Sequence, residues 1–384
     1  MLKQTTFCLI IFMFVAACQT PTVAPQPTLS IAETSTAETP PITLEPPAPT
    51  QATIHTPILP TPANTQSPTT EPPSPPTTAP PILTVAPQTP DGKAIIVDHT
   101  SVDLFEQIPD EYLERARNLG FVFMDASVGQ NIHGALDCLT AVSWSQAPAH
   151  CRRDYTDASG NWTTFASGSA PARIQFTPDP VKYDRSQIIF EARPGDWKSY
   201  TQDFINIVAP QYLDTVSVLS YQFTYLMVVE NSDISDPERG FFANNPDYYD
   251  IYDLENFIAQ HPDKKFPLWT TSLSRNIGTQ VATDFNNQMR QYAIQNGRIL
   301  FDVADIESHT DQGEPCFDNR DGVKSCSNNG ECEDHPDDGV QQPAICQDYT
   351  TEIEGGHLGS VSAGKLRIAK AMWVLLARIA GWEP

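Results

Sequence analysis

The chain has 384 residues, with 47 acidic side chains against 23 basic ones, and its formal net charge is −24 at pH 7. Nucleic acids and anionic membrane surfaces attract clustered lysine and arginine, so this charge balance excludes both as electrostatic partners. Most of the 35 prolines precede residue 91, which indicates a proline-rich N-terminal region followed by a domain of ordinary composition.

Residues 1–18 have the pattern of an export signal. Lys3 supplies a positive charge, residues 7–17 form an apolar segment, and Cys18 follows directly. The apolar segment is too short for a comfortable membrane span. The run Val15-Ala16-Ala17-Cys18 resembles the lipobox of bacterial lipoproteins, in which the cysteine is lipidated. We therefore expect an extracytoplasmic protein that is lipid-anchored to a bacterial membrane through Cys18. An ordinary signal peptide is the alternative.

Residues 19–90 are rich in Pro, Thr, Ala, Ser and Gln and contain few large apolar side chains. Such a segment cannot bury a core, so the composition predicts a disordered linker with polyproline-like stiffness. Residues 91–384 are long enough for one α/β domain with a sizeable core.

Strand and helix patterns alternate along this domain. Alternation of this kind predicts a mainly parallel sheet covered on both faces, a three-layer α/β sandwich, with ligands bound beyond the carboxyl ends of the strands. We expect strands at 94–97, 121–124, 187–192, 215–229, 266–271 and 299–303, and helices at 101–119, 132–142, 196–208, 280–295 and 362–379.

The helix expected at 362–379 is strongly apolar but is interrupted by Lys365, Arg367, Lys370 and Arg378. These charges favour a helix packed in the core over a membrane span.

Six cysteines lie within the domain, and an even number in an exported protein favours disulfides over free thiols. Cys138 and Cys151 are close in sequence and isolated, so we expect them to pair. The other four cysteines lie in one loop and permit three pairings: Cys316, Cys326, Cys332 and Cys346. For this loop, zinc is the less favoured alternative to disulfides because no Cys-x-x-Cys pair is present.

A serine follows the most apolar predicted strand. Residues 121–124 run into Asp125-Ala126-Ser127, and an amphipathic segment follows. A strand, a tight turn with a serine and a helix can expose the serine Oγ at the edge of a sheet, next to the free N–H groups of the helix N-terminus. Ser127 is therefore a candidate nucleophile, although polar turns of this kind also occur without catalytic function.

Glu354-Gly355-Gly356-His357 precedes the last predicted helix. If the loop turns back on itself, Glu354 can reach the Nδ1–H of His357 and leave Nε2 free to accept a proton from a serine. The alternative is a solvated acid next to a histidine that caps the helix.

Together, Ser127-Val128-Gly129 with Asn131, and Glu354-x-x-His357 before a terminal helix, resemble the SGNH (GDSL-like) hydrolase superfamily. The resemblance implies a flavodoxin-like α/β fold and ester hydrolysis through an acyl-enzyme. It implies Ser127 as nucleophile, His357 as general base and Glu354 as the residue that orients His357. The substrate would be a small-molecule or glycan ester, or an acyl group on a lipid.

The resemblance leaves the oxyanion donors open, because no Gly-x-Asn-Asp follows a strand. The backbone N–H of Val128 or Gly129 is one candidate donor. Gln222 and Asn276 are candidate side-chain donors, with Thr224 next to Gln222.

Residues 305–347 form an acidic loop that we expect disulfides to staple. Its carboxylates and asparagines between 305 and 340 suit a hard cation such as calcium, but the EF-hand pattern is absent, and a solvated loop without metal is the simpler interpretation. We expect no other cofactor. The alternative function is a non-catalytic carbohydrate-binding or structural surface lipoprotein with the same fold.

Overall fold

The computed structural model describes residues 87–89, 92–155, 161–275, 279–318, 339–352 and 355–384, and the backbone alone at 323–326 and 332–335. These residues belong to one compact unit. The predicted signal with Cys18, most of the linker, Asn276, Glu354 and the central part of the acidic loop lie outside the described residues.

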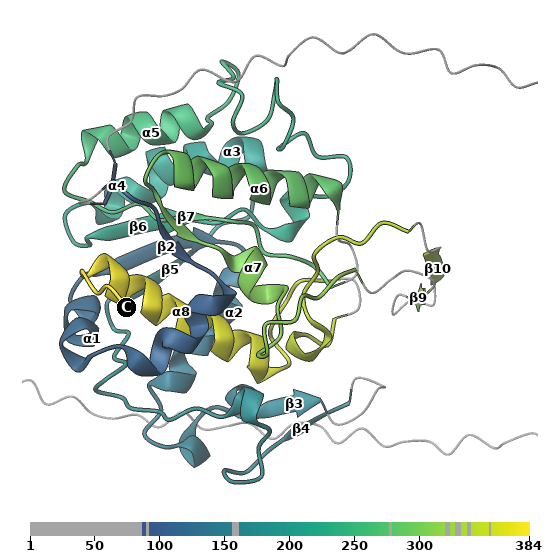
Figure 1. Cartoon of the computed structure of the whole chain (residues 1–384). Coiled ribbons are helices and arrows are strands. Elements are labelled where there is room, and N and C mark those ends of the chain that lie inside the picture. The colour runs from purple at the N-terminus through teal and green to yellow at the C-terminus, as the bar shows by residue number, and fades with distance from the viewer. Residues whose placement is uncertain are drawn as a thin grey trace, which may run out of the picture. The chain divides into compact units, whose positions relative to one another are not determined.

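Six parallel strands form the central sheet (Figure 1). Two groups of three strands are joined by a parallel bridge between Val218 and Lys265, where the Leu219 N–H donates to the Lys265 carbonyl at 2.9 Å. The order across the sheet is β5 (Ile188–Ala192), β2 (Phe121–Asp125), β6 (Val218–Tyr221), β7 (Leu268–Trp269), β8 (Ile299–Phe301) and β1 (Ile95–Val97).

Alternating side chains of each strand enter two separate cores, because successive residues of a strand point to opposite faces. On β2, Phe121 and Phe123 belong to one core, whereas Val122 and Met124 belong to the other. Helices therefore cover both faces, and the α/β class is confirmed. The first core is covered by α1 (Asp110–Arg117), α2 (Ser127–Leu139) and α8 (Ser362–Ile379), and the second by α3 (Trp197–Asp203), α5 (Ile251–Gln260) and α6 (Gln280–Gln295).

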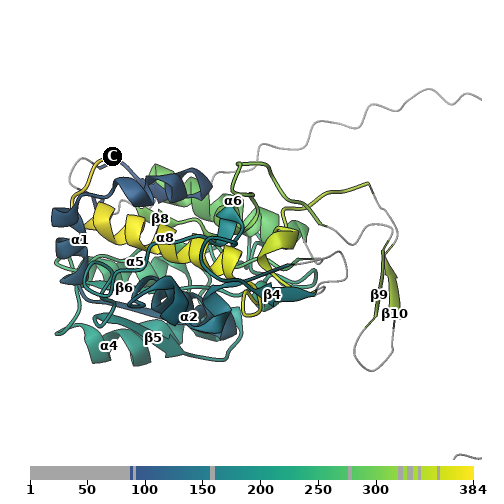
Figure 2. The same cartoon turned by 90° about the horizontal axis from the view of Figure 1, so that it is seen from below.

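The last helix, α8, lies next to α1 and α2 on the first face (Figure 2). Its apolar side chains are almost fully buried, including Trp373 at 0% exposure. Its buried charges meet backbone carbonyls: Lys365 Nζ donates to Gly359 at 2.9 Å, and Arg367 Nε donates to Ile306 at 3.1 Å. Within the residues that the structure describes, no helix combines the length and apolar character that crossing a membrane requires.

The helix expected at 101–119 is two helices. A 3-10 helix, η1 (His99–Gln107), ends before Ile108, and α1 begins after Pro109. Proline disfavours helical backbone in the residue before it, and Ile108 is extended at ψ 119°. Pro109 was therefore the sequence feature that marked the break between the two helices.

The long strand expected at 215–229 is also wrong, because β6 ends at Tyr221. Tyr221 pairs with Met124, and one residue later β2 ends at Asp125. Beyond that point β2 offers no further residue to pair with, and the chain after Tyr221 continues outside the sheet, including a 3-10 helix at Tyr225–Met227.

Short elements complete the structure. They are η2 (Trp144–Gln146), η3 (Ala149–Cys151), η4 (Ala172–Ile174), the π-helical turn η5 (Phe204–Val208), α4 (Ala209–Tyr212), η6 (Tyr225–Met227), α7 (Val303–Glu307), η7 (Gln347–Tyr349), and two hairpins, β3 (Arg153–Tyr155) with β4 (Trp162–Thr164) and β9 (Val323–Cys326) with β10 (Cys332–His335). The helix expected at 196–208 thus continues through η5 into α4, with Pro210 tolerated in the first turn of α4.

Two disulfides lie within the part of the chain that the structure describes. Cys138–Cys151 is confirmed, and Cys316–Cys346 closes the base of the acidic loop. Cys326 and Cys332 face each other in the backbone register of β9 and β10, while their side chains lie outside the described residues. Disulfides indicate an oxidising, extracytoplasmic environment.

Candidate active site

The turn after β2 carries Ser127. Ala126 alone separates the last residue of the strand from the first residue of α2, and Ser127 is exposed. Within this sheet, the chain passes from β2 to β5, which pairs along one edge of β2, and then to β6, which pairs along the other edge of β2. Ser127 therefore lies at the position where the strand order reverses, which is where open α/β sheets bind ligands.

His357 reaches the serine from the loop before α8. Its Nε2 lies 2.6 Å from the Ser127 Oγ, although the two residues are 230 positions apart. The fold thus brings together the two residues that the sequence singles out, in the geometry by which a histidine can accept a proton from a serine.

The carboxylate at the other side of the imidazole is Glu352. Its Oε1 lies 2.5 Å from His357 Nδ1, and its Oε2 accepts the backbone N–H of His357 at 2.9 Å. The sequence interpretation assigned this role to Glu354, which lies outside the described residues. Glu352 lies five positions before His357, whereas Glu354 lies three positions before it. From Glu352 the carboxylate contacts both the ring and the backbone N–H of His357.

The contact between Glu352 and His357 changes the pKa of both side chains. Its hydrogen bond raises the pKa of His357 above the usual 6.5, burial of the ring opposes this change, and the negative charge adds to it. Burial acts to raise the pKa of Glu352, but hydrogen bonds from the His357 side chain and backbone outweigh burial and lower it. Glu352 therefore stabilises the imidazolium that forms when His357 accepts a proton.

The histidine loop is attached to α2 by Asn131. Asn131 lies one turn after Ser127 and accepts the Leu358 N–H through Oδ1 at 2.7 Å. Residues four apart share a face of a helix, so Asn131 and Ser127 both face this loop. On the other side, Thr350 Oγ1 donates to the His357 carbonyl at 2.6 Å.

Two further residues support the loop. The Arg275 backbone N–H donates to the Gly355 carbonyl at 2.9 Å, and its guanidinium donates to the Glu352 carbonyl at 3.3 Å. Tyr225 meets the His357 ring edge-on, with centroids 5.9 Å apart. A Cβ at Gly356 would lie 2.4 Å from the Tyr225 ring and 2.5 Å from the Leu273 carbonyl, so this position requires glycine.

Gly129, one of the predicted oxyanion donors, is closely packed, and its role as a donor stays a prediction. A Cβ there would lie 2.5 Å from both Asp125 Cβ and the Phe190 ring. Its N–H, like that of Ala126, serves the Asp125 carboxylate. The amides of Ser127, Val128 and Gly129 at the start of α2 are the candidate backbone donors.

Of the candidate side-chain donors, the structure describes Gln222 and Thr224. Gln222 is 1% exposed, and its Nε2 donates to the Thr270 carbonyl at 3.1 Å, so it ties the ends of two strands together. Its neighbour Thr224 is also buried. Asn276 lies outside the described residues.

Two buried acids near the nucleophile turn escaped sequence analysis. Burial raises the pKa of Asp125 to about 7, although the Ala126 and Gly129 amides offset part of this effect. Glu307 accepts the Leu273 N–H at 2.7 Å, and burial, with the charge of Asp125 adding to it, raises the pKa of Glu307 well above its usual range. The available signal was that Asp125 and Glu307 each border an apolar run.

Two clusters of potential metal ligands occur among the described residues. Cys138, His150 and Cys151 lie together, but the two thiols are joined in a disulfide. A second cluster combines His99, Asp305 and His309. Much of the predicted calcium loop lies outside the described residues, so that prediction stays open.

Comparison with known proteins finds no match: no family model, no curated protein and no solved structure matches the chain.

Proposed function

We propose that the protein is a serine ester hydrolase of the SGNH type that acts through an acyl-enzyme. The observation that carries the proposal is the continuous chain Ser127–His357–Glu352, with contacts of 2.6 Å and 2.5 Å. A nucleophile, a base within hydrogen-bond reach and a third group that orients the base are the parts that serine acyl transfer requires.

In the proposed reaction, His357 Nε2 accepts the Ser127 hydroxyl proton while Oγ attacks the ester carbonyl. Backbone amides of Ser127 and Val128 stabilise the tetrahedral oxyanion. Collapse of this intermediate breaks the bond to the alcohol oxygen, which takes the proton from His357. Water then attacks the acyl-enzyme with His357 again as base. The bond between the acyl carbon and Ser127 Oγ breaks, Oγ takes the proton from His357, and the carboxylic acid leaves.

The strand order supports the SGNH-like assignment. Numbered from β2 along the chain, the strands β5, β2, β6, β7 and β8 read 2-1-3-4-5, which is the flavodoxin-like order. β1 is an additional strand at the edge next to β8. The nucleophile turn follows the first strand of this series, as the sequence resemblance implies.

The proposed substrate is an ester outside the cytoplasm, on a small molecule, a glycan or a lipid. The two disulfides favour an oxidising compartment. Lipid attachment through Cys18, with residues 19–90 as a tether, remains part of the proposal and rests on the sequence pattern.

The experiment is hydrolysis of p-nitrophenyl esters of increasing acyl length by wild type and Ser127→Ala. We expect turnover by wild type and a loss of at least about 10³-fold in Ser127→Ala. Ser143→Ala is the matched control, because the Ser143 hydroxyl contacts Ser145 and Gln146 rather than a histidine. A wild type that turns over no ester while remaining folded would favour the non-catalytic surface protein with the same fold.

A further inference from the structure

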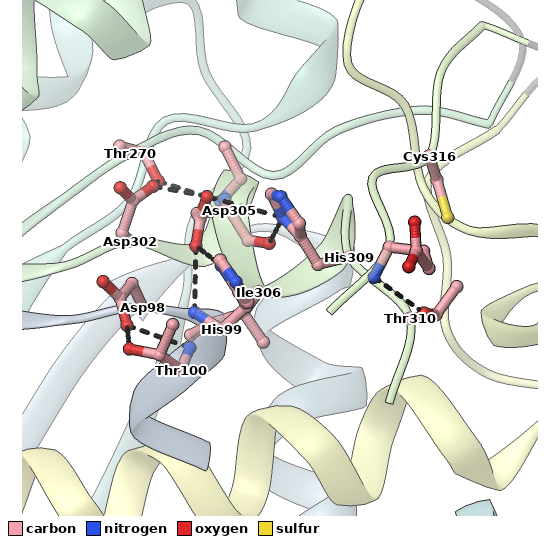
Figure 3. A network of polar contacts seen from close by, with 12 residues as sticks. Asp98, His99, Thr100, Thr270, Asp302, Asp305, Ile306, His309, Thr310 and Cys316 are labelled. Atoms are coloured by element: carbon pink, nitrogen blue, oxygen red, sulfur yellow. Dashed lines mark hydrogen bonds and ion pairs between the residues drawn. The ribbon is translucent and has the colours of Figure 1, made fainter. Parts of the chain in front are cut away.

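A second cluster of chemically active side chains lies at the edge of the sheet formed by β1 and β8. His99 follows β1 at the start of η1, Asp305 lies in α7, and His309 lies one turn after Asp305. Figure 3 shows the three side chains converging from these two segments. One ligand atom from each lies within 4.8 Å of the other two.

Asp305 is the centre of the cluster. Its Oδ2 lies 2.5 Å from His99 Nδ1 and accepts the His99 backbone N–H at 2.9 Å. His309 Nδ1 lies 3.4 Å from Asp305 Oδ1 and 2.8 Å from the Asp305 carbonyl. Both imidazoles therefore turn the same ring nitrogen toward one carboxylate.

The two imidazole rings stack face to face, with centroids 3.8 Å apart and planes 8° from parallel. The stack keeps both rings beside the Asp305 carboxylate. The three side chains are 19–23% exposed, which leaves room for an ion to enter from solvent.

The backbone around the cluster is held from several sides. Arg367 donates to the His99 carbonyl at 3.3 Å, and Tyr349 Oη donates to the His309 carbonyl at 2.7 Å. The Asp305 N–H donates to Asp302 Oδ1 at 3.2 Å. The ligand-bearing segments are thus positioned before any ion arrives, which lowers the cost of binding.

We propose that His99, Asp305 and His309 form a binding site for a divalent transition metal, with Zn²⁺ as the ion that the donor set fits best. Two imidazole nitrogens and one carboxylate oxygen are a recurrent zinc ligand set that leaves a fourth position for water. This inference does not depend on the proposed hydrolase function.

Zinc binding needs a rotation of at least one imidazole, because a metal lies in the plane of each ring that binds it and the two rings are nearly parallel. The distances between the ligand atoms need smaller changes. Zinc bonds of about 2.0–2.1 Å place neighbouring ligand atoms roughly 3.3–3.4 Å apart, close to the 3.4 Å between His309 Nδ1 and Asp305 Oδ1. The pair His99 Nδ1 and Asp305 Oδ2, now at 2.5 Å, opens by less than about 1 Å when zinc replaces their shared proton. The imidazole proton then resides on Nε2 or passes to solvent.

The site would join the end of β1 to the segment that leads into the loop closed by Cys316–Cys346. That segment is already attached to the sheet region, because the Cys316 N–H donates to the Ser308 carbonyl at 2.7 Å. Bound zinc is therefore expected to stabilise the folded chain by linkage.

The test uses isothermal titration of ZnCl₂ into the metal-free, tag-free chain with its disulfides intact, comparing wild type with His309→Phe and His99→Phe. Phenylalanine retains a stacking ring and removes the ligand. We expect each variant to lose one equivalent of bound zinc and the zinc-dependent rise in Tm. His261→Phe is the matched control, since the His261 ring lies tilted against Phe257 outside the cluster, and this variant should bind zinc as wild type does.

Asp305→Asn provides a second variant that keeps the shape and the backbone carbonyl. Circular dichroism of each metal-free variant checks that it is folded. In wild type, zinc should also shift the ¹⁵N resonances of both imidazoles. Equal zinc stoichiometry in wild type and in folded His99→Phe, His309→Phe and Asp305→Asn would overturn the proposal.

Discussion

At the scale of single residues, the structure identifies Glu352 as the acid that contacts His357. It binds both the ring and the backbone N–H of His357, whereas the spacing Glu354-x-x-His357 suggested the acid nearer in sequence. The choice between two acids on one loop depends on the path of the loop, and that path is held by Thr350 and Arg275.

Glu352→Gln and Glu354→Gln therefore form a matched pair. We expect Glu352→Gln to lower kcat by about 10²–10⁴, because the glutamine no longer stabilises the imidazolium, and Glu354→Gln to change it little. Glu352 raises the pKa of His357, so wild-type activity should fall as the pH drops through a value above 6.5. Without that carboxylate the acidic limb should move to lower pH. The reverse ranking of the two variants would return the orienting role to Glu354.

Asp125 should make stability depend on pH. Its pKa in the folded protein is about 7 against the usual 3.8, so the native state binds this proton more tightly than the unfolded state does. The resulting stabilisation is full below about pH 4 and is lost as the pH rises through about 7, on the order of 4 kcal/mol in total. Asp125→Asn should remove this dependence in denaturant titrations between pH 4 and 8. Parallel pH profiles for both proteins would contradict it.

At the scale of elements, the site depends on contacts between α2 and the loop before α8. Asn131 is the side chain of α2 that holds Leu358, and through it His357, beside Ser127. The helix also places Asn131 and Ser127 on one face, because they are four residues apart.

Asn131→Ala should lower kcat/KM for the ester substrate by about fivefold, because loss of one such hydrogen bond is worth roughly 1 kcal/mol and lets His357 move away from the serine. Asn131→Asp keeps an oxygen that can accept the Leu358 N–H, so it should retain more activity than Asn131→Ala. The measurement is kcat/KM on the alkaline plateau of the pH profile, where His357 is deprotonated, with Tm as a check on folding. Identical kinetics in the two variants would show that the contact does not position the histidine.

Long periodic elements were predictable from the sequence, whereas their ends were decided by neighbours. α6 and α8 coincide with the helices expected at 280–295 and 362–379, because each has a long apolar pattern. The run 215–229 contains apolar and β-branched residues well beyond Tyr221, but β6 ends where its partner β2 ends. Local composition contains no information about the length of a partner strand.

The same limit applies to the candidate site. Ser127 and His357 could be found because each lies in a distinctive local pattern, a serine after a buried strand and a histidine after two glycines. The acid that contacts His357 could not be identified in this way, and the apolar runs beside Asp125 and Glu307 did not reveal their roles, since all three roles arise from contacts across the fold.

At the scale of the whole molecule, alternation of strands and helices was enough to predict a parallel sheet with helices on both faces, which Figure 1 shows. The order of strands was not predictable in this way, because it depends on which strands pair. The folded unit also includes residues before the first strand. Lys265 Nζ donates to the Gln88 carbonyl at 2.6 Å, and the Phe266 N–H donates to Gln88 Oε1 at 3.4 Å.

Two truncations test where the domain begins. A chain starting at Pro87 should keep the wild-type Tm and ester turnover, because every described contact of Gln88 is retained. A chain starting at Ala94 should melt at a lower temperature, since Lys265 and Phe266 lose these partners near the bridge that joins the two halves of the sheet. Thermal unfolding of both proteins provides the measurement, and a lower Tm for the first truncation would extend the domain toward the N-terminus.

The most direct test of the central claim is labelling with a fluorophosphonate, followed by mass spectrometry of the labelled peptide. The account predicts a single adduct on Ser127, formed faster as the pH rises through the pKa of His357, and absent in Ser127→Ala but present in Ser143→Ala. Equal labelling of wild type and Ser127→Ala, or an adduct on another serine, would contradict the assignment of Ser127 as the nucleophile.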